Sequence, residues 1–240
     1  MKAIETRKLS KSYGDICAVK ELDLEVNEGE LFALLGVNGA GKTTTIKMLS
    51  GLTEPTGGEF SVLGRSKMED IKPLINVSPQ ETAIAPNLTV RENLEFICGI
   101  YGFDRAESKT RAAAMLGEFS MEEVARQKAK TLSGGWQRRL SIAMALISEP
   151  KLLFLDEPTL GLDVIARREL WHIIEGLKGR VTVILTTHYL EEAEALSDRL
   201  AVMAKGRLIA VGTASELMAK AGCDKFEDAF VTLCGGGAAV

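Results

Sequence analysis

Hydrophobic and polar positions along the first third of the chain predict strands of two kinds. Apolar and polar side chains alternate over residues 23–26, which indicates a strand with one exposed face and is typical of antiparallel sheets. Residues 31–35 form a continuous apolar run, which indicates a strand buried on both faces. A glycine-rich segment follows, and residues 43–52 then predict a helix that ends near Gly51.

Residues 89–146 carry a mostly helical pattern. Thr89 and Glu92 fit a capping box, with Thr89 as N-cap and Glu92 at the third helical position. Residues 105–130 are rich in Ala, Glu, Lys and Arg, which are strong helix formers. This region therefore predicts a helical insertion in the surrounding chain.

Residues 152–203 return to short apolar runs that alternate with helical segments. Strands are expected at residues 152–155, 181–186 and 200–203, with helices at about residues 166–178 and 190–196 between them. Strands that alternate with helices predict an α/β fold with a mostly parallel core sheet.

One domain is expected over residues 1–240, with an N-terminal antiparallel β portion in its core. The expected divisions are residues 1–84 and 149–220 for the core, 85–148 for an inserted α-helical subdomain, and 221–240 for a C-terminal helix with a mobile glycine-rich tail.

The composition excludes several classes of protein. With 46% hydrophobic and 26% charged residues, the chain is an ordinary globular protein and not a disordered one. A net charge of −4 argues against a nucleic-acid binder, which needs a basic balance. The four cysteines form no C-x-x-C pair, which argues against a zinc site or a disulfide framework.

Because no apolar run approaches the roughly 20 residues that span a bilayer, a soluble intracellular chain is expected.

A phosphate-binding motif lies between the buried strand and the helix that follows it. Residues 36–43 match G-x-x-x-x-G-K-[ST] in the strand–loop–helix context that the motif requires. Lys42 is expected between the phosphates, and the Thr43 hydroxyl is expected to coordinate Mg²⁺. The residues predicted to contact the nucleotide are Gly36, Asn38, Gly39, Ala40, Gly41, Lys42, Thr43 and Thr44. The motif therefore predicts that the α/β fold is that of a P-loop NTPase.

Carboxylates and a histidine follow two other strands. Asp156 and Glu157 come directly after the apolar run 152–155, at the strand end where ligands of parallel sheets bind. Asp156 is predicted to hold Mg²⁺ and Glu157 to polarise the attacking water. His188 follows another strand and is expected to reach the terminal phosphate or the water, whereas His172 is read as an ordinary surface or packing residue. Without the phosphate loop, the two acids would equally suit a strand end that meets solvent.

Residues 131–139 separate this chain from other P-loop proteins. Ser133 can cap a helix, and the adjacent Gly134 and Gly135 leave backbone N–H groups open to an anion. The segment resembles the Leu-Ser-Gly-Gly-Gln signature of ATP-binding cassette (ABC) ATPases, with Trp136 in place of the final Gln. Val37 also departs from the proline that many members carry. Neither difference removes a catalytic group.

The resemblance covers nearly the whole chain and implies further roles. Tyr13 looks like the aromatic residue that stacks on adenine, and Gln80 resembles the Q-loop glutamine that contacts Mg²⁺ or water. Residues 161–163 look like the D-loop that crosses to a partner, although a turn with an acidic helix cap also fits. The family pairs two cassettes head to tail, with each ATP held between the phosphate loop of one and residues 133–135 of the other.

The resemblance implies an ATPase that binds ATP and Mg²⁺, forms a homodimer and drives separate integral membrane permease subunits from the cytoplasmic face. The permease contact is expected through the helical insertion near Gln80 and residues 85–105. Residues 186–194 and 226–233 are similar to drug-, lipid- and polysaccharide-type exporters. A soluble ABC ATPase acting on a ribosome, DNA or an assembly scaffold is the alternative, and a P-loop kinase is opposed by the signature. The transported substrate cannot be read from this chain.

Overall fold

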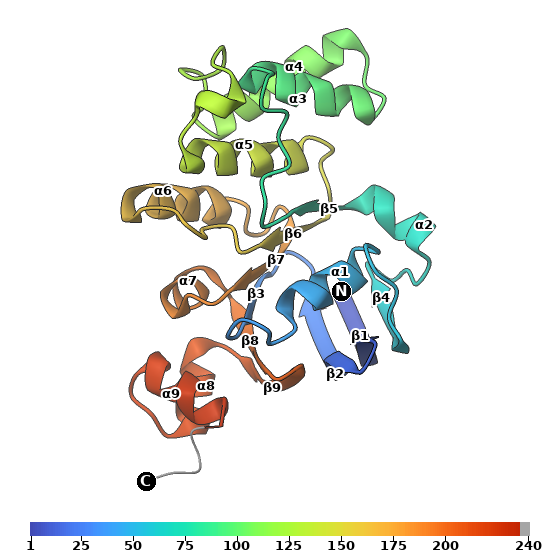
Figure 1. The fold of residues 1–240 in the computed structure, drawn as a ribbon, viewed down its shortest axis with the longest axis vertical. Coiled ribbons are helices and arrows are strands. Elements are labelled where there is room, and N and C mark those ends of the chain that lie inside the picture. Colours follow the sequence, from blue (N-terminus) through green and yellow to red (C-terminus); the bar gives the residue numbers. More distant parts are fainter. Residues whose placement is uncertain (236–240) are drawn as a thin grey trace.

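The computed structural model describes residues 1–235, which form two β-sheets with helices around them (Figure 1). The tail that the sequence predicts to be mobile lies, from residue 236 onward, outside the described residues. Within residues 1–235, no helix combines the length and the apolar character that crossing a bilayer requires.

The N-terminal part of the chain forms a three-stranded antiparallel sheet. Strand β1 (Lys2–Tyr13) lies between β2 (Ile16–Asn27) and β4 (Gly57–Val62), and both neighbours run antiparallel to it. Side chains of β2 alternate between buried and exposed over residues 22–27. The antiparallel strand that the alternating pattern predicts is therefore confirmed.

A six-stranded core sheet has the order β5-β6-β7-β3-β8-β9. Its strands are β3 (Leu31–Leu35), β5 (Ile75–Ser78), β6 (Leu152–Asp156), β7 (Thr182–Thr187), β8 (Arg199–Ala204) and β9 (Arg207–Gly212). Neighbouring strands run parallel except for the β8–β9 hairpin. This confirms the mostly parallel sheet, and it brings the carboxyl ends of five strands to one edge.

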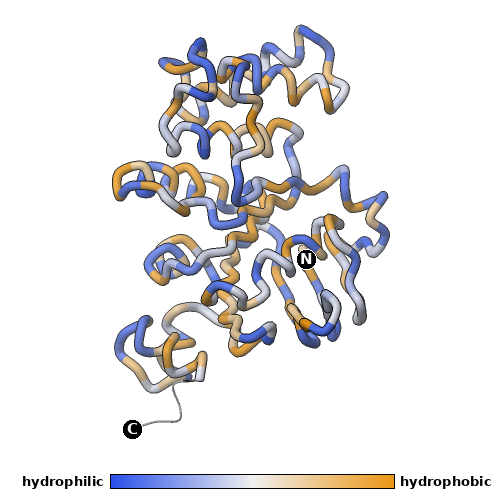
Figure 2. The backbone as a smooth tube through the Cα atoms, viewed as in Figure 1, coloured by the Kyte–Doolittle hydropathy of each residue, from blue (hydrophilic) through white to orange (hydrophobic). Residues whose placement is uncertain are grey.

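The two faces of the core sheet pack into different hydrophobic clusters, because successive side chains of a strand point to opposite faces. Phe32 and Leu34 of β3 pack with helix α1 (Lys42–Leu49) and the antiparallel sheet. Leu31, Ala33 and Leu35 pack on the other face with the remaining large helices. Figure 2 shows the hydrophobic residues concentrated along these central strands. The apolar run 31–35 is thus a strand buried on both faces.

The helical region follows β5 and lies beyond the β5 edge of the core sheet, next to α6 (Val164–Glu175) (Figure 1). It contains α3 (Val90–Ile100), α4 (Arg105–Glu118), the short 3₁₀ helix η2 (Ala129–Thr131) and α5 (Gly134–Leu146). The predicted capping box is present, since the Thr89 hydroxyl accepts from the Glu92 N–H and the Glu92 carboxylate accepts from the Thr89 N–H.

Residues 105–130 do not form a single helix, although they are rich in helix-forming residues. Helix α4 stops at Glu118, Phe119 is fully buried, and Ser120 has a left-handed φ of 51°. Burial of Phe119 overrides the local propensity and turns the chain back towards α5. The subdomain divisions at residues 84/85 and 148/149 remain predictions.

The remaining helices complete the core and the C-terminal part. Helices α6 (Val164–Glu175) and α7 (Leu190–Leu196) pack on the same face as α5. Helix α2 (Met68–Ile71) and the 3₁₀ helix η1 (Lys72–Leu74) lead into β5. Helices α8 (Ala214–Ala221) and α9 (Phe226–Leu233) pack against each other, so a C-terminal helix is present as expected.

Candidate active site

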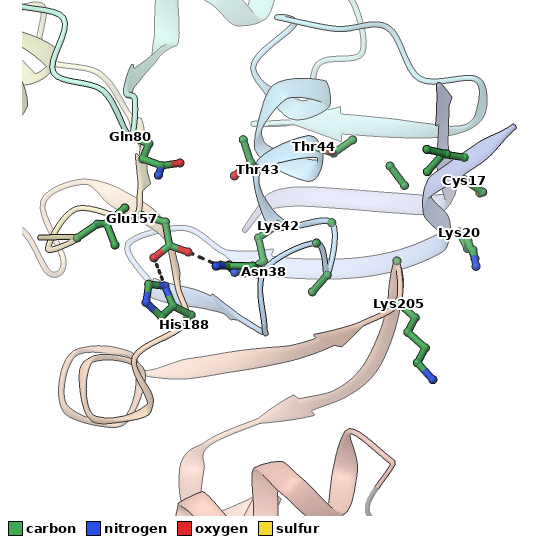
Figure 3. Close-up of a pocket in the computed structure, with 17 residues that line it drawn as sticks. Cys17, Lys20, Asn38, Lys42, Thr43, Thr44, Gln80, Glu157, His188 and Lys205 are labelled. Carbon is green, nitrogen blue, oxygen red and sulfur yellow. Dashed lines mark hydrogen bonds and ion pairs between the residues drawn. The ribbon is translucent and has the colours of Figure 1, made fainter. Parts of the chain in front are cut away.

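A cavity of about 670 Å³ lies at the carboxyl ends of the core strands (Figure 3). It is lined by residues 38–44, which follow β3, and by Gln80, Glu157 and His188, which follow β5, β6 and β7. Parallel strands bring these segments together because their carboxyl ends share one edge of the sheet. The structure therefore gathers groups from four separated parts of the sequence in one place.

Two glycines of the phosphate loop are required by close backbone contacts. A Cβ on Gly36 would lie 2.5 Å from the Met203 carbonyl oxygen, and one on Gly41 would lie 2.7 Å from the Ala18 carbonyl oxygen. Gly41 also has a left-handed φ of 104°, which favours glycine. The loop is thus wedged between β8 and β2, and helix α1 begins beyond it with no side-chain cap on its N–H groups. These N–H groups are free to bind an anion.

Lys42 is a buried cation whose ammonium group has three partners within the protein. Its Nζ donates to the Gly36 carbonyl at 2.7 Å and to the Val37 carbonyl at 3.4 Å. The same atom lies 3.2 Å from Glu157 Oε1, and both side chains are more than nine-tenths buried. A buried charge needs such compensation, and the phosphate loop supplies it.

Glu157 joins Lys42 to His188, as Figure 3 shows. Its Oε2 lies 2.7 Å from His188 Nδ1, and an ionised carboxylate can only accept, so the histidine nitrogen is the donor. Glu157 has a left-handed φ of 49°, held by two bonds from its N–H to the Thr186 carbonyl and hydroxyl oxygens. A strained backbone held in this way is common where a side chain must be aimed.

A second polar group lies beside the start of α1. Asp156 Oδ1 accepts from the Thr43 hydroxyl at 3.0 Å and from the Thr186 hydroxyl at 2.5 Å. Asp156 is buried, and Thr43 lines the cavity. Hydroxyl and carboxylate oxygens are the hard donors that Mg²⁺ prefers, so this pair fits the ion.

Gln80 lies at the edge of the cavity, and its main chain is tied to helix α5. The Arg138 guanidinium donates to the Pro79 carbonyl at 2.6 Å and also to the Gln80 carbonyl. Burial lowers the pKa of Arg138, and the negative charge of Asp156 partly opposes this. Sequence reasoning missed this arginine, because its contacts depend on how α5 packs beside β5.

The residues of the signature segment do not line the cavity of this chain. Ser133 and Gly134 are exposed at the start of α5, and Gly135 is half-buried. The Ser133 side chain makes no capping bond, so the expected serine cap is not formed by the hydroxyl. The first N–H groups of α5 are left available to a ligand from outside the chain.

The far end of the cavity is lined by residues that sequence reasoning also missed. Ile16, Cys17, Ala18 and Lys20 come from β2, and Lys205 and Gly206 come from the β8–β9 turn. Two backbone bonds join this turn to β2 and to the phosphate loop, from Lys20 N–H to Gly206 and from Gly206 N–H to Ala40. No sequence motif marks these positions.

Tyr13, expected beside adenine, is about half exposed and lies outside the cavity lining. It ends β1, and the Lys11 ammonium lies 5.1 Å from its ring centroid. Asp163, in the segment that resembles a D-loop, caps α6 by accepting from the N–H groups of Ile165 and Ala166. His172 is largely exposed, as expected of a surface residue.

This fold and site are those of a P-loop ATPase, and comparison with known proteins identifies the family. Residues 19–160 match the family described as "ABC transporter". The Nod factor export ATP-binding protein I of Cupriavidus pinatubonensis is 42% identical over 93% of this chain and 70% of its own length. The daunorubicin/doxorubicin resistance ATP-binding protein of Streptomyces peucetius is 43% identical over 92% of this chain and 68% of its own length.

Solved structures agree with these relatives. An ATP-binding subunit of an ABC transporter superposes with a TM-score of 0.84 and 31% identity, covering 96% of this chain and 99% of that one. A dimeric ATP-binding cassette in a post-hydrolysis state, bound to ADP and phosphate, superposes with a TM-score of 0.78 and 26% identity over 88% of this chain and 98% of that one.

The chain belongs to the ABC transporter family, as one of its ATP-binding subunits. Members bind and hydrolyse ATP, pair with a second cassette and act with membrane permeases. Their peripheral position on the cytoplasmic side follows from that partnership. Family, fold and ATPase activity are therefore confirmed.

Proposed function

We propose that this chain hydrolyses ATP with Glu157 as the general base and so powers export by membrane permeases. The observation that carries the proposal is the buried carboxylate of Glu157, held between Lys42 and His188 at the mouth of the phosphate loop. A carboxylate in this position can accept a proton from water aligned with the terminal phosphate.

Lys42 supports the proposal because its partners can be exchanged. Its ammonium group now faces two loop carbonyls and Glu157. Phosphate oxygens of ATP entering the loop would replace some of these partners with stronger, charge-assisted ones. Moving Lys42 towards the nucleotide would also release one oxygen of Glu157 to bind water.

His188 would then hold the other oxygen of Glu157 through Nδ1. Its remaining ring nitrogen, Nε2, is free to donate or accept at the reacting centre, because the ring is about three-tenths exposed. We assign His188 the role of fixing the carboxylate and contacting the terminal phosphate.

Mg²⁺ would be held by the Thr43 hydroxyl, with Asp156 behind it and Gln80 at the cavity edge. The ion would neutralise charge on the phosphates as the bond to the leaving oxygen breaks. Among residues 1–235 there is no cluster of three or more His, Cys, Asp or Glu side chains suited to a metal. A site completed by phosphates and water is the usual arrangement for this ion.

A second copy of the chain would complete the site with the N–H groups of Ser133, Gly134 and Gly135. Ser133 and Gly134 are exposed and Gly135 is half-buried, and all three lie outside the cavity of their own chain. Tyr13 would stack on adenine from the end of β1, where it pairs with Ile16 of the cavity lining.

Export is favoured by the relatives. One is named for Nod factor export, and others for resistance to linearmycin and to daunorubicin and doxorubicin. These names favour a transport ATPase over a soluble ABC ATPase.

Co-expression with a candidate permease tests the proposal of export. The chain should co-purify with the permease in detergent and should hydrolyse ATP faster in its presence. An ATPase rate that the permease leaves unchanged would count against the proposal.

Turnover of Mg-ATP by wild type and Glu157→Gln tests the catalytic part. We expect turnover to fall by at least about a hundredfold while ATP binding persists, because the amide keeps the shape of the side chain but cannot accept the proton. An E157Q chain as fast as wild type would show that Glu157 is not the base.

A further inference from the structure

Asn93, on helix α3, is a fully buried amide that the proposed mechanism does not use. Its Oδ1 accepts from the Ala85 N–H at 2.7 Å, and its Nδ2 donates to the Ala85 carbonyl at 3.1 Å. Nδ2 also donates to the carbonyls of Thr89 at 2.9 Å and Leu88 at 3.4 Å. An asparagine side chain has one acceptor oxygen and two N–H donors, so all of them are directed at residues 85–89.

Residues 85–89 form the loop that leads from the cavity edge into α3. Pro86 and Asn87 in the middle of the loop are exposed, so burial does not fix its shape. A buried amide costs free energy unless its groups are paired, and every pairing of Asn93 is with this loop. The side chain therefore holds the two ends of the loop together.

The loop in turn holds the segment that precedes the signature. The Leu88 carbonyl accepts from the Ala129 N–H at 2.8 Å. The Pro86 carbonyl accepts from the Lys130 N–H at 3.0 Å. Both donors belong to η2, which leads directly into the signature residues 133–135. The loop carbonyls thus fix the chain just before the signature.

Gln137 connects the same segment to helix α5. Its Nε2 donates to the Ala129 carbonyl at 3.3 Å and to the Leu132 carbonyl at 3.2 Å. Ala129 is therefore bonded to the loop through its N–H and to α5 through its carbonyl. A displacement of the loop reaches the start of α5 through these two bonds.

The same loop also follows Gln80, so a change in its shape has a second possible target, the cavity of its own chain. The contacts favour the signature. Hydrogen bonds from Asn93 begin at Ala85, whereas the Pro79 and Gln80 carbonyls are bound by Arg138. The cavity edge thus has its own fixed partner, which does not depend on Asn93.

We propose that Asn93 is a positioning residue for the signature, because it fixes the loop that holds residues 133–135 where they meet the ATP of a second copy. The inference rests on the composite site of the proposed function. It assigns Asn93 no contact with ATP. Loss of Asn93 should damage the half-site that the chain offers to its partner and spare the half-site formed by its own phosphate loop.

Three variants allow each half of the site to be tested separately. Asn93→Asp keeps the size of the side chain but loses the N–H donors to three carbonyls, so we expect Mg-ATP turnover to fall by about tenfold. Lys42→Ala damages the phosphate loop and leaves the signature intact. Gly134→Asp places a carboxylate in the signature and leaves the phosphate loop intact.

A random mixture of N93D and K42A should recover about a quarter of wild-type turnover, because each mixed dimer joins the intact phosphate loop of N93D to the intact signature of K42A. A mixture of N93D and G134D should remain no faster than N93D alone, since no site then contains two intact halves. Recovery with G134D instead of K42A would show that Asn93 acts on its own cavity and would overturn the proposal. Recovery with both partners, or with neither, would indicate a general defect and would overturn it too.

Cys98→Ala is the matched control, because it removes another fully buried side chain of α3 that has no bond to the loop. It should lower thermal stability and keep turnover within about twofold of wild type. Equal losses of turnover in N93D and C98A would contradict a positioning role. If N93D does not fold, Gln137→Met removes the bonds to Ala129 and Leu132 at similar volume and should give the same mixing pattern; any other pattern would count against the proposal.

Mixing K42A with G134D checks the proposed function by itself. Recovery to about a quarter of wild-type turnover would establish the composite site, and the N93D mixtures would then decide the role of Asn93 alone. If that mixture shows no recovery, or if E157Q is as fast as wild type, the proposed function fails and the role of Asn93 falls with it.

Discussion

The phosphate loop and the signature segment both place helix N-termini where they can bind phosphate, but they differ in what surrounds them. Polar groups around the phosphate loop are buried and paired with one another, as Lys42 is with Glu157 and Thr43 is with Asp156. The signature residues Ser133 and Gly134 are exposed, and the Ser133 side chain makes no capping bond to α5. One half of the site is therefore preorganised within the chain, and the other is prepared for a second molecule.

The difference follows from topology. The phosphate loop lies at the edge where parallel strands end, so neighbouring strands supply its partners. Helix α5 starts in the helical region beyond the β5 edge of the sheet (Figure 1), and the residues at its start, Ser133, Gly134 and Gly135, do not line the cavity at the strand ends. Arg138 connects the signature helix to the cavity that holds the phosphate loop, since it extends from α5 and binds the Gln80 main chain.

Gly134→Asp tests whether the signature segment binds phosphate across a dimer, and we expect it to cause the largest loss of ATP turnover among these variants. An acidic residue in the first turn of α5 should leave the isolated chain as stable as before, because it interacts favourably with the helix dipole. Across a dimer it would face the phosphates, so we expect ATP turnover to fall by about a hundredfold, with thermal stability unchanged.

Gly134→Ala is the matched control, because a Cβ there meets only the Leu162 side chain at 3.8 Å. Mixing G134D with Lys42→Ala adds a second measurement. Each mixed dimer contains one intact composite site, so about a quarter of wild-type turnover should return in a random mixture of two inactive chains. No recovery on mixing would mean that the signature does not act across a dimer.

A smaller effect should come from Thr43→Val, which alters only the phosphate-loop half. The valine keeps the volume but loses the hydroxyl that contacts Asp156. We expect the Mg²⁺ concentration for half-maximal turnover to rise by about tenfold, as for other changes around a metal site. Thr45→Val loses a hydroxyl on the same helix whose bond goes to the Gly41 carbonyl, and it should not shift the Mg²⁺ requirement. Equal shifts in both variants would argue against a metal role for Thr43.

The smallest effect should come from Arg138→Lys, which tests the connection between the halves. Lysine keeps the charge but cannot bind the Pro79 and Gln80 carbonyls together, so we expect turnover to fall by about fivefold. Arg139→Lys, on the same helix but paired with Glu169, serves as the control. Turnover that falls equally in the two variants would point to general damage to α5.

Much of the fold could be predicted because its signals are local. The alternating pattern of β2, the apolar run of β3 and the capping box at Thr89 each depend on a few adjacent residues, and the structure confirms all three. The end of α4 could not be predicted from helix propensity, because burial of Phe119 decides it.

The sequence by itself determined the phosphate loop, the carboxylates after β6 and the family, since each depends on residue types at short fixed spacings. Only the tertiary structure decided that Lys42, Glu157 and His188 form one chain of contacts, and that Arg138 binds the main chain of Gln80. Those contacts join residues far apart in the sequence. Their distances depend on how strands align and helices pack, which no local pattern contains.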